Sequence, residues 1–237
     1  MQLITNLQSS FDSTLTDSNF QNLGIDLAEI GIDSILNQGL LKEIPIVSTI
    51  ANLSKVGANI HDRLFLKKVL SFLNQMKSVS VDKRKEMIDK IDSSSKYRIK
   101  VGEKLLYIID SCEDYEISEL VSIVFKSYIQ EKISYDDFLK VSTILSKINK
   151  SDFDWFVAER KNHSFDLDDV GDLISSGLFE LHYEKVSVSV EDESDYDLLQ
   201  EGKKYNTDVD GGDISVSLSG AGKVILEIFC TSYQKSK

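Results

Sequence analysis

The chain has 237 residues with 39 acidic and 27 basic side chains, which give a formal net charge of −12. Hydrophobic residues make up 41 % of the sequence, which is enough for a substantial core and too many for a disordered chain. Two cysteines exclude a disulfide framework and a cysteine-rich zinc site. The first twenty residues lack the features of a secretory signal, and no stretch of uninterrupted apolar residues is long enough for a membrane span. We therefore expect a soluble, cytoplasmic protein.

The charge is distributed unevenly along the chain. Residues 1–150 carry 20 acidic and 19 basic groups, whereas residues 151–237 carry 19 acidic and 8 basic groups. Within the first part, residues 61–104 hold 12 basic and 6 acidic groups. The negative charge therefore belongs to the last third, where it either keeps a surface soluble or attracts a basic partner.

Apolar residues recur at helical spacing on both sides of the single proline, Pro45. Before the proline this pattern begins at Phe20, with Asp17 or Ser18 as the N-cap. A proline fits the first turn of the helix that follows, because that turn needs no N–H donor. We predict a helical hairpin over 20–75 with its hinge just before Pro45.

Further helices follow, most of them with a clear start signal. The predicted helices cover 81–91 after Ser80, 100–112, 117–129, 135–148 after Ser134, and a segment that begins after Ser151. Ser134 with Asp137, and Ser151 with Asp154, both fit a capping box in its aspartate variant. The connections between these predicted helices are short, as is typical of antiparallel helical bundles. We predict an all-helical domain over 1–161.

The periodicity changes beyond this domain. Asp166 is the predicted N-cap of another helix, and Gly177 is its predicted left-handed C-cap. Two segments with alternating apolar residues, 186–190 and 214–218, predict strands that pair as a hairpin with a long loop, and a last helix follows them. The predicted fold class is therefore mainly α, with an N-terminal helical bundle followed by a small α+β, winged-helix-like domain over 162–237.

Four stretches carry a resemblance to known families. LLKEIPIVSTIANLSKVGANIHDRLFLKKVLSFL (40–73) and the stretch from YRIKVGEKLL to VSTIL (97–145) resemble a group of uncharacterised bacterial helical proteins, some from antiviral-defence or mobile-element neighbourhoods. LISSGLFEL (173–181) and ISVSLSGAGKVILEIFC (214–230) resemble the ending of winged-helix domains, with Ser217 or Ser219 where that ending has Thr. The resemblance carries no catalytic signature, so it implies fold, lineage and a setting in antiviral defence rather than an activity.

Two glycine-containing motifs are similar to ligand-binding loops but depart from them at required positions. DVDGGD (208–213), read as a calcium loop from Asn206, places Ser217 where the bidentate glutamate belongs, so we expect an exposed turn. SGAGK (219–223) lacks the spacing of a phosphate loop, so we expect Ser219 to cap a helix. The three histidines show no metal-binding spacing, and both cysteines lie on apolar faces. We predict no cofactor and no metal, and we assign no catalytic residue.

The basic middle of the chain offers a candidate contact to phosphate or to an anionic lipid surface. The candidate residues for this contact are Lys67, Lys68, Lys83, Arg84 and Lys85. The alternative, which we favour, is a solvated helix face on which acidic neighbours pair with these residues one turn away.

The acidic end of the chain offers a candidate surface for a protein partner. Its residues are Asp168, Asp169, Asp172, Glu191, Asp192, Glu193 and Asp195. The first three lie on the helix that a winged-helix protein would place on DNA, where phosphates would repel them, so DNA binding through this domain is disfavoured. Our main hypothesis is a non-enzymatic binding or regulatory module whose acidic C-terminal domain contacts an unidentified protein.

Two alternatives stay open. The apolar hairpin at 23–60 would make the chain an effector that perturbs membranes once it is triggered, although apolar runs of about 10 to 14 residues are typical of buried helices. The acidic domain would otherwise act as a decoy of nucleic acid. The oligomeric state is not predicted, and an enzyme stays open if distant acidic and histidine side chains converge in a pocket.

Overall fold

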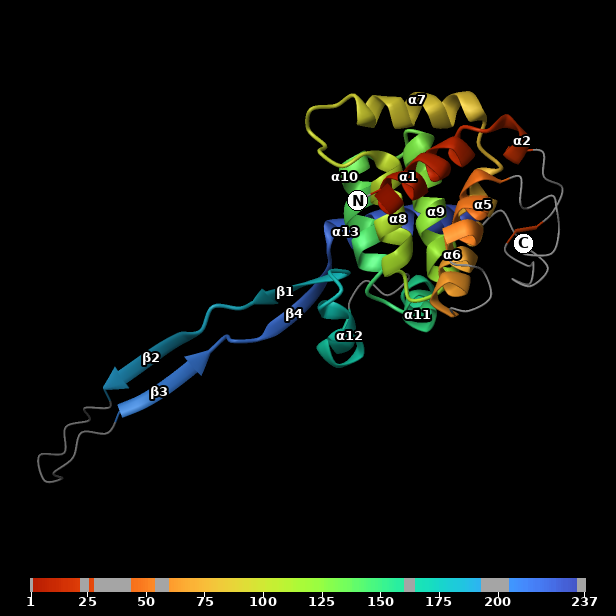
Figure 1. Ribbon diagram of the computed structural model, residues 1–237. Helices are drawn as coiled ribbons and strands as arrows, with labels where there is room; N and C mark the ends of the chain where they lie inside the picture. Colours follow the sequence, from red (N-terminus) through yellow and green to blue (C-terminus); the bar gives the residue numbers. More distant parts are fainter. Residues whose placement is uncertain are drawn as a thin grey trace, which may run out of the picture.

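The computed structural model describes residues 2–21, 26–27, 44–53, 60–159, 165–192 and 205–233 (Figure 1). The helices are α1 (Gln2–Leu15), α2 (Ser18–Gln21), α5 (Pro45–Leu53), α6 (Ile60–Met76), α7 (Val81–Asp92), α8 (Val101–Ser111), α9 (Tyr115–Ile129), α10 (Tyr135–Leu145), α11 (Lys150–Ala158), α12 (Leu167–Ile174) and α13 (Gly220–Tyr233). The strands are β1 (Phe179–Tyr183), β2 (Ser187–Asp192), β3 (Tyr205–Asp210) and β4 (Ile214–Leu218). The predicted mainly α architecture, a helical bundle followed by a small α+β region, is confirmed.

The centre of the bundle is the contact between α6 and α9, the most extensive one between two elements. The buried Ser118 hydroxyl of α9 donates a hydrogen bond of 2.8 Å to the carbonyl of Lys68 in α6. Phe72 of α6 lies near both Phe11 of α1 and Phe125 of α9, with ring centroids 6.0 Å and 5.9 Å away. Aromatic packing therefore joins α1, α6 and α9 into one core.

The helix starts predicted from capping residues are mostly confirmed. Ser80 accepts a hydrogen bond from the third residue of α7, and Ser134 with Asp137 forms the capping box of α10. Helix α5 begins at Pro45. Gly177 has a φ of +93°, so its predicted left-handed conformation is confirmed, but the C-cap of α12 is Ser175, two residues earlier.

Other elements differ from their predictions or escape them. The predicted cap of α11 is wrong: Asn149, rather than Ser151, accepts a hydrogen bond from the N–H of Asp152, at 2.9 Å. Asparagine is an equally good cap and stands two residues earlier, so the helix starts there. Helix α1 has no counterpart in the prediction. Much of the predicted hairpin over 20–75 (residues 22–25, 28–43 and 54–59) lies outside the described residues.

The strands form one long ribbon that extends away from the helices (Figure 1). Strand β1 pairs with β4, and β2 pairs with β3, all antiparallel. The predicted pairing of 186–190 with 214–218 is therefore wrong. The chain leaves the body through β1 and β2 and returns through β3 and β4, so each strand meets the partner that lies at the same distance from the body.

Helix α13 brings the chain back to the bundle, where it contacts α10 and α11. Phe153 and Phe229 meet edge to face with centroids 4.9 Å apart, and Phe156 meets Phe179 in the same way at 5.7 Å. The hydrophobic core thus continues from the bundle into α12, the start of β1 and α13. Most of the ribbon lies outside this core.

Candidate protein-interaction surface

The outer half of the ribbon carries exposed apolar side chains. We call residues 186–192 and 205–210 the tip ribbon. Val188 pairs with Val209 and Val190 with Thr207, so these four β-branched residues share one face. The three valines of this face are 58–61 % exposed, and Val186 just before β2 is exposed as well. We call Val188, Val190, Thr207 and Val209 the valine face. Within the described chain, the one extensive contact that β2 and β3 form is with each other.

The opposite face of the tip ribbon is polar. Ser189 pairs with Asp208 and Ser187 with Asp210, and all four are exposed. Acidic residues dominate the whole ribbon, which has Lys185 as its single lysine or arginine within 179–192 and 205–218. Its acidic residues are Glu180, Glu184, Glu191, Asp192, Asp208, Asp210 and Asp213. The ribbon is therefore amphipathic, with an apolar face and an acidic setting.

Two glycines lie in the turn that connects β3 to β4. Gly211 and Gly212 have φ angles of +87° and +91°, which side chains rarely adopt. A Cβ at Gly211 would also lie 2.4 Å from the carbonyl oxygen of Lys185 on the paired segment. The DVDGGD motif therefore comprises the end of β3 and a tight turn, as predicted. Within the described chain, no three metal-ligating side chains gather.

The acidic residues predicted as a partner surface divide into two groups. Asp168, Asp169 and Asp172 are exposed on α12, which packs against β1 and β4 at the base of the ribbon. Glu191 and Asp192 belong to β2, but their side chains, like Glu193 and Asp195, lie outside the described residues. The structure thus brings the α12 carboxylates next to the ribbon. Sequence reasoning missed the valine face, although the alternation of valines marked one side of β2.

The basic residues predicted to contact phosphate or lipid are mostly engaged within the protein. The Lys68 ammonium donates hydrogen bonds to the carbonyls of Asp110, at 3.1 Å, and Cys112 at the end of α8. The Lys67 ammonium lies 5.1 Å from the ring centroid of Tyr115. Such contacts satisfy part of the charge that a phosphate or lipid headgroup would otherwise satisfy.

On α7 the three predicted residues have different surroundings. Lys83 lies 3.2 Å from the Glu86 carboxylate and 3.5 Å from that of Glu131, and Lys85 is exposed. The prediction for Arg84 is wrong, because its side chain is wholly buried and therefore cannot contact an external surface. Among the described residues, no nitrogen of its guanidinium has a hydrogen-bond partner, and the Phe20 ring centroid is 5.5 Å away. Burial lowers the pKa of Arg84.

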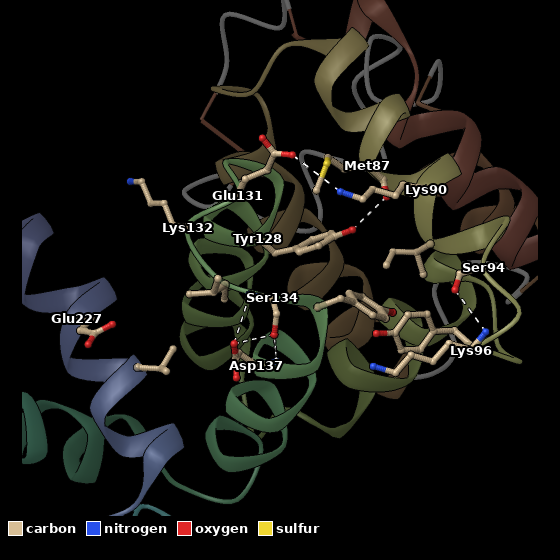
Figure 2. A pocket seen from close by; sticks show the side chains of 15 residues that line it. Met87, Lys90, Ser94, Lys96, Tyr128, Glu131, Lys132, Ser134, Asp137 and Glu227 are labelled. Atoms are coloured by element: carbon tan, nitrogen blue, oxygen red, sulfur yellow. Dashed lines mark hydrogen bonds and ion pairs between the residues drawn. The ribbon is translucent and has the colours of Figure 1, made fainter.

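A cleft of about 700 Å³ lies between the end of α7, the turn from α9 to α10, and α13 (Figure 2). Its polar groups largely satisfy one another. The Tyr128 hydroxyl donates a hydrogen bond of 3.2 Å to the carbonyl of Met87, and Lys90 lies 3.9 Å from Glu131. Burial raises the pKa of Tyr128 to about 12. The Tyr135 hydroxyl has no hydrogen-bond partner in the part of the chain that the structure describes, and the residue is 5 % exposed, so this hydroxyl is buried in the wall of the cleft.

Three further side chains that could be reactive, Cys112, His182 and Ser219, have contacts that indicate a structural role. Burial raises the pKa of Cys112 to about 12, which keeps it as an unreactive thiol. The His182 Nε2 lies 2.7 Å from the Ser217 hydroxyl, but His182 is exposed and Ser217 half-buried on the β1–β4 pair, where this hydrogen bond joins the strands. Ser219 caps α13 by accepting a hydrogen bond of 2.9 Å from the N–H of Gly222, as predicted for SGAGK.

Comparison with protein-family models, with curated proteins and with solved structures found no match to this chain. In the described part of the chain, no helix has the length and apolar character needed to cross a bilayer. The apolar segment 23–60 is described only at 26–27, 44–53 and Ile60. Val47 and Ile50 of this segment are buried in the core.

Proposed function

We propose that the protein is a binding module whose tip ribbon docks on a basic partner protein. The observation that carries this proposal is the valine face, an exposed apolar surface that extends from the body. Exposed apolar surface of this kind marks interaction sites on soluble proteins. The setting of such a module in antiviral defence follows from the resemblance alone and is part of the proposal.

The low stability of a two-stranded ribbon by itself favours a state in which a partner covers the valine face. An isolated two-stranded hairpin is marginal in water, and hairpins gain stability when a third strand or another surface covers their apolar face. Burying a half-exposed valine contributes roughly 1 kcal/mol before the entropic cost of association. A partner that covers the valine face would therefore stabilise both the contact and the ribbon.

The negative charge of the ribbon indicates which kind of partner would bind it. The ribbon that carries the valine face has seven acidic residues, and Asp168, Asp169 and Asp172 add negative charge at its base. A second copy of the chain would bring the same charges together, which is unfavourable, whereas a basic surface is attracted over about 10 Å at moderate salt. The partner that fits is a protein with an aliphatic strip bordered by lysine or arginine.

The test compares two double variants in a crosslinking pull-down from cells, with the captured protein identified by mass spectrometry. Val188→Thr/Val209→Thr keeps β-branched residues on the valine face but makes it polar, and Ser187→Thr/Ser189→Thr changes the opposite face as a matched control. We expect a net-basic protein to be retained by the wild type and the control, lost by the valine variant, and released at about 0.5 M salt. Equal retention by all three forms would contradict the proposal.

Sedimentation velocity supplies a second readout. The proposal expects the wild type to have the same oligomeric state as Val188→Thr/Val209→Thr. A wild-type dimer that this variant dissociates would show instead that the valine face contacts a second copy. The membrane-perturbing and nucleic-acid-decoy alternatives stay predictions.

A further inference from the structure

A second apolar surface lies on the helical body, away from the ribbon. Two hollows of about 320 Å³ and 450 Å³ share His61, Phe65 and Asp110 and therefore form one continuous groove. Leu7 of α1, Phe65 of α6 and Leu106 of α8 line the first hollow, and Leu64 and Tyr115 line the second. We call this surface the α6–α8 groove.

The groove exposes large apolar side chains that the bundle does not need for its own packing. Leu64 and Tyr107 are 52 % and 51 % exposed, and Ile60, one turn before Leu64 on α6, is exposed as well. Residues four apart on a helix lie on one face, so Ile60 and Leu64 form an aliphatic ridge beside the groove. Exposed ridges of this kind bury area readily against a partner helix.

Carboxylates border the groove on several sides. Its acidic lining residues are Asp62, Glu103, Asp110, Glu113 and Asp114, from α6, α8 and the turn that follows α8. The two lysines among the lining residues are already engaged, since the Lys67 ammonium lies over the Tyr115 ring and Lys68 donates to carbonyls of α8 and its C-cap. The field at the groove is therefore negative, and a ligand with positive charge is attracted.

We propose that the α6–α8 groove binds a basic amphipathic helix of a partner protein. Aliphatic side chains of that helix would enter the hollows beside Phe65 and Leu106, and lysine or arginine residues flanking them would meet Glu103 and Asp110. The groove has both properties that this occupant needs, an apolar floor and an acidic border. This site is separate from the tip ribbon and does not depend on the function proposed for it.

The test uses the full chain and a fluorescent synthetic peptide with the repeat LKKLLKL, which forms a basic amphipathic helix. Its matched control is the repeat LEELLEL, which has the same apolar pattern and the opposite charge. Fluorescence anisotropy measures binding of both peptides. We expect the basic peptide to bind and the acidic peptide not to bind. Equal binding of the two, or binding of neither, would overturn the proposal.

Variants locate the binding site. Leu64→Ala with Tyr107→Ala removes exposed side chains, so the fold should survive, and we expect the dissociation constant for the basic peptide to rise at least roughly tenfold. Ile99→Ala, which truncates an exposed apolar residue outside both hollows, should leave binding unchanged. Glu103→Gln with Asp110→Asn should weaken binding mainly at low salt.

Two outcomes separate this proposal from others. If Val188→Thr/Val209→Thr abolishes peptide binding while Leu64→Ala/Tyr107→Ala does not, the peptide binds the tip ribbon and the groove proposal is wrong. If the wild type dimerises and Leu64→Ala/Tyr107→Ala dissociates the dimer, the groove contacts a second copy and the proposal is overturned in favour of self-association. Failure of the ribbon pull-down has no bearing on either peptide result.

Discussion

The carboxylate of Asp12 in α1 occupies the space where any side chain at Gly102 of α8 would lie. A Cβ built on Gly102 would be 1.7 Å from Asp12 Oδ1 and 2.6 Å from its Cγ. Oδ1 is buried there without a hydrogen-bond partner. Contact between α1 and α8 therefore depends on the absence of a side chain at position 102.

Gly102→Ala is expected to destabilise the protein although alanine is the better helix former. The new Cβ forces the Asp12 carboxylate out of its place against α8, and overpacking of this kind costs about 1–3 kcal/mol. The control is Gly171→Ala in α12, where a Cβ meets nothing within 4 Å and a gain of up to about 1 kcal/mol is expected. Urea denaturation measures both, and a stabilised Gly102→Ala would contradict the contact.

Asp12→Asn is expected to change how stability depends on pH. Burial, with a smaller effect of Asp92, raises the pKa of Asp12 to about 6, while Gln8 and Lys100 act in the opposite direction. The folded state therefore holds this proton between about pH 4 and pH 6 more tightly than the unfolded chain, so this carboxyl lowers stability as pH rises through that window.

The comparison between wild type and Asp12→Asn isolates this effect. The two should have similar stability near pH 4, and the variant should be the more stable one above about pH 6, by up to ~1.4 kcal/mol for each unit of pKa shift. Denaturant titrations between these pH values measure the difference. A difference that does not vary with pH would show that Asp12 ionises normally.

Glu131 adopts a left-handed conformation, with φ +58°, where α9 ends. The N–H of Lys132 donates to the carbonyl of Ser127 at 3.0 Å, and that of Glu131 donates to the carbonyl of Tyr128 at 2.8 Å. This pair of hydrogen bonds is the helix ending that favours glycine at position 131. Its exposed ion pairs with lysines of α7 contribute little.

Glu131→Gly is therefore expected to be about 1 kcal/mol more stable than Glu131→Ala, because only glycine relieves the left-handed strain. At Gln130, where φ is −80°, the same pair of substitutions should show the reverse order. Thermal or urea unfolding of the four variants checks this. The same order at both positions would mean that strain at Glu131 is not the cause.

Two tyrosines of the cleft should respond oppositely to loss of the hydroxyl. Tyr135→Phe removes a buried hydroxyl that has no partner and should raise the free energy of unfolding by about 1 kcal/mol. Tyr128→Phe removes the donor to the Met87 carbonyl and should lower it by about 1 kcal/mol. Urea denaturation measures both. Destabilisation by Tyr135→Phe as large as that by Tyr128→Phe would show that its hydroxyl has a partner in solution.

Arg84 shows how a local pattern is overruled by packing. Its charge suggests an exposed residue, yet it lies at helical spacing with Met87, Ile88 and Ile91, the buried face of α7. That spacing was the signal in the sequence that could have predicted its burial, although we assigned Arg84 to an external contact. A charged residue is usually exposed, but its position along the helix decides whether it lies on the face that packs against the core.

The sequence by itself determined the features that depend on residues a few positions apart. Ser80, Ser134 with Asp137, Pro45 and Ser219 act where they were predicted to act, because capping and the fixed φ angle of proline are local. Tertiary structure alone decided that β4 pairs with β1, that Val188 and Val209 are exposed, and that Leu64 borders an acidic groove. Periodicity shows which side chains share a face, but only the path of the whole chain decides whether that face is covered.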